Sequence, residues 1–517
     1  MNFTQKDIET LSKKGITEEQ VHQQIALFKQ GLPYIDLRDP AIIGHGIYAY
    51  TEEEQNTFVS FFETHKEALD LLKFTPASGA ATRMFKFLFQ FIEDYDPTKE
   101  TVNAYINRTQ ALDLRLFFVG LDSFPFYKKI RKRFKKKYGK KDQTNVDLNR
   151  VRFVKLMLEE DGLNFGNKPK GLFPFHKYKS HNASAFEEHL FEGALYAKAN
   201  GIARLHFTIS KDHHKKFKSQ FEKTQKRIEE KTNTKFDISY SFQAASTDTI
   251  AVTTDNEPFR KEDGCMVFRP GGHGSLIQNL NEQDADIIFI KNIDNVVVHT
   301  YEKEVAHYKK VLAGKLLKLQ QQAFTYLELI DQREISESEI LEIVHFLQNE
   351  FSLKLSVDFE KFSQKYQIEY LREQLDKPIR VCGMVKNEGE PGGGPFWVKH
   401  ESNRISLQIV ESVQIDPNNL HQQNIVSKAT HFNPVDIVCG IKNYKGEKYD
   451  LTKFIDTKAA FIAHKTVAGK PIKALEHPGL WNGAMAFWNT IFVEVPLITF
   501  NPVKTVNDLL KPAHSMK

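Results

Sequence analysis

Four short segments of this 517-residue chain carry residues suited to binding phosphate groups and a metal ion. The first is a run of small residues at 76–86 (PASGAATRMFK), which follows a short apolar stretch and leads into a helical pattern. Small residues between a strand and a helix let backbone N–H groups approach phosphate oxygens, and the helix N-terminus adds a favourable partial charge. Arg83, in the first helical turn, is able to bind an anion through two hydrogen bonds. Tight packing of the small residues is the competing explanation.

A lysine and a glycine-rich segment are the second and third candidates. Lys170, held in the turn at 168–171 (KPKG), offers a point charge to a phosphate group, although a solvated surface lysine has the same pattern. The three glycines around His273, at 271–274 (GGHG), let the backbone press against a flat ligand such as a base or a ribose. The alternative is an ordinary surface turn.

The fourth candidate is Asp294, which follows the apolar strand expected at 286–290. In open α/β sheets ligands bind at the carboxyl ends of the strands. A carboxylate at such a position can hold Mg²⁺, which shares its coordination shell with water and substrate phosphates. A turn or a helix cap built on the Asp-Asn pair is the alternative.

Taken in order, these four segments resemble the sugar-phosphate nucleotidyltransferases, in particular the UDP-sugar pyrophosphorylases. That family has a Gly-Gly-x-Gly-Thr-Arg-Met loop after its first strand, then Pro-Lys, then Pro-x-Gly-His-Gly or Pro-x-Gly-Asn-Gly, and then Asp-Asn after a later strand. The matching segments here are SGAATRM at 78–84, PK at 169–170, PGGHG at 270–274 and DN at 294–295. The whole chain also resembles an uncharacterised bacterial family of about this length that shares the PASGAATRM loop.

The resemblance implies an enzyme that forms an NDP-sugar, with a UDP-sugar preferred, and pyrophosphate from a nucleoside triphosphate and a sugar 1-phosphate, with Mg²⁺ as cofactor. The segment HFNPVD at 431–436 is similar to a later segment of the family and adds two candidate metal ligands. The implied residues are Arg83 and Lys170 for catalysis, Ser78, Gly79, Ala80, Ala81, Thr82, Gln243, Gly272, His273 and Gly274 for nucleotide binding, and Asp294, Asn433 and Asp436 for the metal.

The chain departs from the family pattern in its phosphate loop. Ser78 and Ala81 stand where the family has glycine, and a methyl group on the loop would hinder close approach of a phosphate. A catalytically silent nucleotide-sugar-binding protein of the same fold is therefore the alternative function. The connection from Arg83 to Lys170 is also longer than in the family, which makes Lys86 an alternative lysine.

Apolar strand patterns alternate with helical patterns through the middle of the chain, and this favours an α/β fold. By the resemblance, the fold is Rossmann-like (GT-A-type), with a mostly parallel mixed sheet and helices on both faces. The expected parts are a helical N-terminal extension at 1–72, the nucleotidyltransferase-like α/β domain at 73–300 with a helical insertion at about 96–165, a helical segment at 301–375, and a β-rich C-terminal part at 376–517 that completes the substrate site.

The composition indicates a soluble cytoplasmic protein. Three scattered cysteines form no disulfide or zinc pattern, the N-terminus is polar, and no stretch is apolar enough for a membrane helix. The formal net charge of +5 is small for this length, and the basic run at 128–141 is expected to be a solvated helix face. A nucleic-acid partner is therefore not expected, and the sequence leaves the oligomeric state open.

Overall fold

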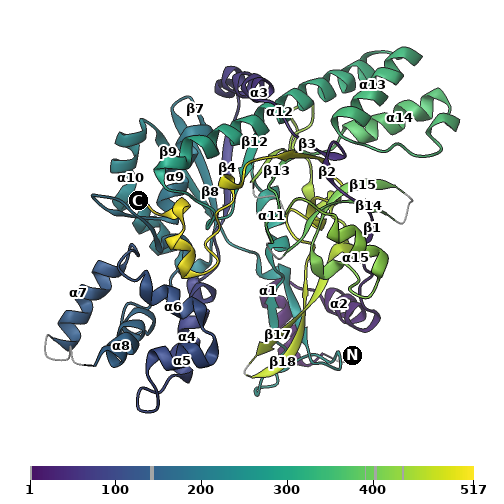
Figure 1. Ribbon diagram of the computed structural model, residues 1–517. Helices are drawn as coiled ribbons and strands as arrows, with labels where there is room; N and C mark the ends of the chain where they lie inside the picture. Colours follow the sequence, from purple (N-terminus) through teal and green to yellow (C-terminus); the bar gives the residue numbers. More distant parts are fainter. Residues whose placement is uncertain are drawn as a thin grey trace. The chain divides into compact units, whose positions relative to one another are not determined.

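The structure, a computed structural model, describes residues 3–139, 145–389, 392–400, 404–432, 436–467 and 469–516. The protein is a mixed α/β protein that divides into two compact units, each built from separate stretches of the chain (Figure 1). Unit 1 comprises Met1–Phe74, Ser241–Ile290 and Tyr308–Pro496, and unit 2 comprises Thr75–Tyr240, Lys291–His307 and Leu497–Lys517. Among the described residues, none of the helices has the length and apolar character needed to cross a membrane.

The main sheet of unit 1 mixes parallel and antiparallel strand pairs. Its strands, in spatial order, are β2 (Ile42–Ile43), β3 (Gly46–Tyr48), β19 (Asn489–Glu494), β13 (Ile379–Met384), β16 (Asp436–Gly440), β12 (Ile287–Ile290) and β4 (Leu71–Pro76). Strand β16 runs antiparallel to both of its neighbours, and the other pairs are parallel. Strands β12, β13 and β16 are buried along their whole length, so they form the centre of the unit 1 core.

Two smaller sheets complete the β structure of unit 1. One has the order β1 (Asp36–Pro40), β14 (Gly394–Lys399) and β15 (Ile405–Val410). The other has the order β11 (Phe268–Pro270), β10 (Asp248–Val252), β18 (Lys470–Glu476) and β17 (Phe461–Val467). Leu11, Val21 and Ile25 of the first two helices pack with Ile250 and Val252 of β10, which anchors the start of the chain in this unit.

The helices of unit 1 include those predicted near the N-terminus and after residue 300. They are α1 (Gln5–Lys14), α2 (Glu18–Gln30), α3 (Glu52–His65), α11 (Leu276–Asn281), α12 (His299–Gln332, which begins in unit 2), α13 (Glu337–Glu350), α14 (Gln364–Leu375) and α15 (Leu420–Ser427). Thr17 caps α2, because its side chain accepts a hydrogen bond from the Gln20 N–H. Helix α3 ends at His65, and a short 3₁₀ helix at Lys66–Ala68 leads to β4.

Unit 2 contains the predicted helical insertion and a small group of strands. Its helices are α4 (Lys86–Asp94), α5 (Val102–Thr109), α6 (Leu112–Val119), α7 (Tyr127–Tyr138), α8 (Val146–Leu158), α9 (Ala185–Tyr196) and α10 (His214–Thr232). Its strands are β5 (Pro174–Lys177), β6 (Asn182–Ser184), β7 (Lys198–Ala199), β8 (Ile202–Thr208) and β9 (Lys235–Ser241). On α7 the basic side chains are exposed and Ile130 is buried, as expected for a solvated helix face.

Candidate functional site

The predicted phosphate loop of unit 2 lies between β4 and α4 and is held at both ends by main-chain hydrogen bonds. The Ala77 N–H donates to the Thr208 carbonyl at 2.8 Å. At the other end, the Ala81 N–H donates to the Lys168 carbonyl at 2.9 Å, and the Lys170 N–H donates to the Gly79 carbonyl at 3.1 Å. The loop and the segment that carries Lys170 are therefore one fixed unit, although more than eighty residues separate them in sequence.

Three consecutive amides at the tip of this loop are free to bind an anion. Ser78, Gly79 and Ala80 are exposed, and within the described part of the chain their N–H groups have no hydrogen-bond acceptor. A Cβ atom added at Gly79 would meet nothing within 4 Å, so the space in front of the loop is open. The methyl group of Ala81 is buried in the protein. The substitution of glycine by alanine at 81 thus leaves the exposed amides accessible.

Lys170 and Asp294 meet in the same unit. The Lys170 Nζ lies 2.5 Å from the Asp294 Oδ2, and both side chains are about one-fifth exposed. The two segments pack closely at Gly171, where an added Cβ atom would lie 2.8 Å from the side chain of Ile293. The Ile293 N–H donates to the Pro76 carbonyl at 3.2 Å, which connects the aspartate segment to the start of the loop. Three of the four predicted segments therefore converge in unit 2.

The residue after Asp294 has a structural role. The buried Asn295 side chain donates to the Thr499 carbonyl at 3.0 Å and accepts from the Asn501 N–H at 2.8 Å. These two bonds fix the main chain on the C-terminal side of Asp294. The Asp294 carboxylate is thereby presented by a rigid backbone, which is a requirement for a precise binding site.

Arg83 and Thr82 lie on the exposed side of the turn that follows the loop. The Thr82 hydroxyl donates to the Gly166 carbonyl at 2.9 Å, so it supports the loop. The Arg83 guanidinium makes no ion pair or hydrogen bond within the described residues and remains available to an anion. Lys86, the alternative lysine, is the exposed first residue of α4 and likewise makes no such contact in that part of the chain.

Lys168 is a further cation that the sequence did not single out. Its ammonium group lies 4.4 Å from the centre of the Phe165 ring. Burial, together with the positive charges of Lys129 and Lys216, lowers the pKa of Lys168 to about 8. A lysine whose neighbouring charges are all positive stabilises an anion more than an ion-paired lysine does. The basic residues in the sequence gave no sign of this arrangement, because the three lysines lie far apart along the chain.

The glycine segment at 271–274 packs within unit 1 against the residues that follow β18. A Cβ atom at Gly274 would lie 2.1 Å from the Pro478 carbonyl oxygen, and one at Gly271 would meet the His477 ring at 2.3 Å. The His273 imidazole stacks on Trp481 with ring centres 4.7 Å apart. Gly271 and Gly274 therefore have a packing role inside the protein, and the contact of this segment with a nucleotide stays a prediction.

We expect Gly274→Ala to lower the free energy of unfolding by about 2–3 kcal/mol, because a methyl group has no room beside a main-chain carbonyl. Urea unfolding followed by circular dichroism measures this change. Gly79→Ala is the matched control and should stay within about 0.5 kcal/mol of the wild type, since its methyl group enters open space. Equal stability of the two variants would contradict the packing role of Gly274.

The remaining predicted residues lie in unit 1 or outside the described residues. Asp436 is buried on β16 and forms an ion pair with Lys309, which is also buried. Gln243 is half-buried and donates to the Thr247 hydroxyl at 3.3 Å. Asn433 lies outside the described residues. Asp436 therefore has a protein cation as its partner and presents no exposed oxygen to a hydrated metal ion.

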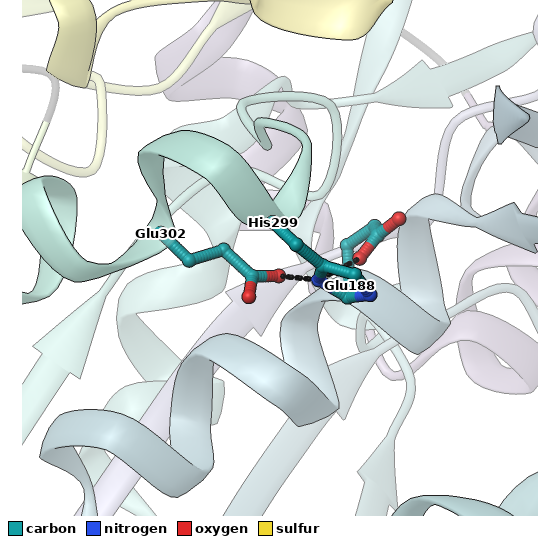
Figure 2. Close-up of side chains that lie close together, drawn as sticks. All are labelled: Glu188, His299 and Glu302. Atoms are coloured by element: carbon teal, nitrogen blue, oxygen red, sulfur yellow. Dashed lines mark ion pairs between the residues drawn. The ribbon is translucent and has the colours of Figure 1, made fainter. Parts of the chain in front are cut away.

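A second group of polar side chains in unit 2 was not predicted from the sequence. Glu188 of α9 and His299 and Glu302 of the first turn of α12 lie close together, with the imidazole between the two carboxylates (Figure 2). Their ligand atoms are all within 4.8 Å of one another. The sequence contained one indirect signal, namely acidic residues inside the strongly apolar helix at 185–196.

The chain matches, over residues 4–515, the family described as "Domain of unknown function (DUF4301)". It belongs to this family. No curated protein matches the chain. The resemblance of the whole chain to one uncharacterised family is thus confirmed, and the description of that family assigns no activity.

Solved structures of UDP-sugar pyrophosphorylases are similar to this DUF4301 chain at low sequence identity. One is the uridine diphosphate N-acetylglucosamine pyrophosphorylase from Trypanosoma brucei, with 11% identity, 98% of this chain and 79% of that chain covered, and a TM-score of 0.49. Another is a mutant UDP-glucose pyrophosphorylase from Leishmania major in complex with UDP-glucose, with 12% identity, coverages of 98% and 78%, and a TM-score of 0.43. Identities this low carry no information about substrate.

Proposed function

We propose that this protein is a nucleotidyltransferase that joins a nucleoside triphosphate to a sugar 1-phosphate and releases pyrophosphate. The observation that carries the proposal is the convergence in unit 2 of three free loop amides, the ion pair of Lys170 with Asp294, and the unpaired Arg83. Free amides and unpaired cations on a fixed backbone bind phosphate oxygens with little reorganisation. The order of the sequence segments supports a UDP-sugar as the preferred product.

The reaction would require positioning and charge neutralisation but no general base. An ionised oxygen of the sugar 1-phosphate attacks the α-phosphorus, a new P–O bond forms, and the bond from the α-phosphorus to the bridging oxygen breaks. The two electrons of that bond leave with pyrophosphate. Lys170 and Arg83 would bind the oxygens on which negative charge increases, while the amides at 78–80 hold the phosphate chain in line.

Asp294 fits Mg²⁺ in combination with bound phosphates. Mg²⁺ keeps several waters and is commonly held by one or two carboxylates together with substrate phosphates. Asp294 offers one carboxylate that is partly exposed and lies on the same rigid segment as the loop connection. When bound, the metal would neutralise phosphate charge as a Lewis acid. The proposal assigns no metal role to Asp436, which is buried with Lys309.

The test is a thermal-shift screen of the purified protein with UTP, ATP, CTP, GTP and dTTP, each with and without Mg²⁺. A ligand present at about 100 times its dissociation constant adds about 2.7 kcal/mol of stability, which raises the melting temperature measurably. The stabilising nucleotide is then assayed for pyrophosphate release with a series of sugar 1-phosphates. No stabilisation by any nucleotide would contradict the proposal. Stabilisation without pyrophosphate release would favour the silent nucleotide-sugar-binding protein instead.

Triphosphate affinity should fall as the pH rises through the pKa of Lys168. With that pKa at about 8, Lys168 is charged at neutral pH and attracts the triphosphate, but it loses its proton at higher pH. We expect the dissociation constant to increase about tenfold between about pH 7 and pH 9.5, as one charged contact is lost. Isothermal titration calorimetry measures it. Lys168→Met should bind weakly and show a flatter pH profile, and an unchanged profile would exclude this role of Lys168.

A further inference from the structure

The group of Glu188, His299 and Glu302 in unit 2 has the composition and spacing of a metal site. The His299 Nδ1 lies 2.8 Å from the Glu302 Oε1 and 4.0 Å from the Glu188 Oε2 (Figure 2). Two carboxylates and one imidazole supply oxygen and nitrogen ligands that suit divalent transition metals. None of these residues belongs to the proposed phosphate site.

Two aromatic rings fix the imidazole of His299. Tyr178 stacks on it with ring centres 4.3 Å apart and an angle of 14° between the planes. Phe191 meets it edge-on at 4.9 Å and 79°. The ring is therefore held between two aromatic side chains with its Nδ1 toward the carboxylates. Fixed orientation of a ligand before the metal arrives is what tight metal sites require.

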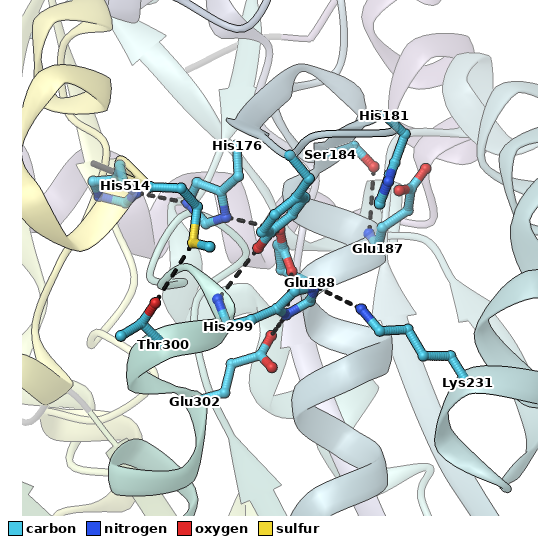
Figure 3. A network of polar contacts seen from close by, with 12 residues as sticks. His176, His181, Ser184, Glu187, Glu188, Lys231, His299, Thr300, Glu302 and His514 are labelled. Carbon is cyan, nitrogen blue, oxygen red and sulfur yellow. Dashed lines mark hydrogen bonds and ion pairs between the residues drawn. The ribbon is translucent and has the colours of Figure 1, made fainter.

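One oxygen of Glu188 is held by a relay of hydrogen bonds (Figure 3). The Tyr178 hydroxyl donates to the Glu188 Oε1 at 2.9 Å, and the His176 Nδ1 lies 2.7 Å from the same oxygen. The other nitrogen of His176 lies 2.9 Å from the Nδ1 of His514, whose Nε2 in turn lies 3.1 Å from the Asn501 carbonyl oxygen. Metal-binding carboxylates and histidines are typically oriented by such an outer layer of partners.

The other oxygen of Glu188, Oε2, is buried without a hydrogen-bond donor among the described residues. Glu188 as a whole is only 1% exposed. The His299 Nδ1 lies 4.0 Å from this oxygen, beyond hydrogen-bond distance. The Glu302 Oε1 is also buried, and its partner is the His299 Nδ1 at 2.8 Å. A buried carboxylate oxygen without a donor is costly, and a bound cation would satisfy the Glu188 Oε2.

We propose that the Glu188 Oε2, the His299 Nδ1 and the Glu302 Oε1 bind a divalent transition-metal ion. Ligands placed about 2.1 Å from a tetrahedral metal are about 3.4 Å apart, and the two observed separations of 2.8 and 4.0 Å lie on either side of this value. Binding through Nδ1 leaves a proton on the Nε2. Lys231, whose Nζ lies 3.2 Å from that nitrogen, is exposed and can move into solvent.

The bound metal joins α9 to the first turn of α12 and, through His176, to the C-terminal segment that carries His514. These parts of unit 2 come from three separate stretches of the chain. The site therefore stabilises unit 2, and its function can be measured without any enzyme assay.

The test uses the full chain stripped with a chelator and titrated with Co²⁺, followed by visible absorption, with Zn²⁺ as competitor and elemental analysis for stoichiometry. We expect one Co²⁺ per chain, its displacement by Zn²⁺, and a metal-dependent increase in melting temperature. Glu302→Gln and His299→Gln keep the side-chain volume and should each weaken binding by about 100-fold. Both variants should match the wild type in circular dichroism and in melting temperature with chelator present.

Two control variants separate this site from others in unit 2. His213→Gln removes a histidine outside the group and should leave Co²⁺ binding unchanged. Asp294→Asn removes the proposed Mg²⁺ ligand and should also leave it unchanged. Wild-type affinity in both Glu302→Gln and His299→Gln would overturn the proposal, as would loss of Co²⁺ binding in Asp294→Asn alone. Failure of the nucleotide screen has no bearing on this result, because no residue is shared.

Discussion

Replacing Asp294 with asparagine is expected to reduce pyrophosphate release by about a thousandfold or more, which corresponds to about 4 kcal/mol of transition-state stabilisation. Asparagine has the size of aspartate but lacks the charge, so the proposed Mg²⁺ loses its protein ligand. Lys170 loses its ion-pair partner in the same variant. The measurement is kcat/KM for pyrophosphate release from the stabilising nucleotide and a sugar 1-phosphate, over a series of Mg²⁺ concentrations.

Asp237→Asn is the matched control, because this aspartate is exposed on β9 of the same unit and makes no contact with the loop. It should retain the wild-type rate and the wild-type dependence on Mg²⁺. Both variants should unfold at the temperature of the wild type, since both side chains lie at least partly at the surface. Full activity of Asp294→Asn would remove the metal assignment from this residue.

The strands that carry the candidate site could be predicted because they are short apolar runs followed by polar or small residues. The apolar stretch before the loop is β4 (Leu71–Pro76), and the strand expected at 286–290 is β12 (Ile287–Ile290). The antiparallel direction of β16 could not be predicted. A strand buried on both faces is the same apolar run whether its neighbours are parallel or antiparallel. The sheet is mixed, as expected, and in unit 1 its antiparallel pairs are those of β16.

The candidate site was predictable to the extent that it depends on local chemistry. The loop at 78–82 has a pattern of small residues, and Asp294 follows an apolar strand, so the sequence was enough to propose both as site residues. The main-chain hydrogen bonds that connect this loop to residues 168–170 could not be predicted, because any residue type can form them. The sequence also does not show that the methyl group of Ala81 is buried. A buried methyl group does not hinder a phosphate at the loop, as the alanine at this position was expected to do.

The group around Glu188 could not be predicted from the sequence. Its members come from α9, from the start of α12 and from the last residues of the chain, and only the fold brings them together. What the sequence did contain was acidic residues in a helix that is buried on nearly every side. Such residues conflict with the burial pattern around them, and conflicts of this kind are where functional sites are expected.

Lys170→Met is expected to lower the rate of pyrophosphate release by about 100- to 1000-fold, the range seen when one preorganised donor to a transition state is removed. In the structure, the Lys170 ammonium neutralises Asp294. With Asp294 holding the proposed Mg²⁺, the Lys170 ammonium would be available to phosphate oxygens. The variant therefore loses a transition-state contact, and the effect should appear in kcat more than in KM. Steady-state kinetics at saturating Mg²⁺ measure both constants.

Lys86→Met tests the alternative lysine and serves as the control. Lys86 is exposed at the start of α4 and has no contact with Asp294, so its loss should change the rate by less than about threefold. The reverse result, with an inactive Lys86→Met and an active Lys170→Met, would move the catalytic role to Lys86. Because Lys170 and Asp294 contact each other, the double variant should lose much less than the product of the two single effects. Independent effects would show that the two residues do not act in one site.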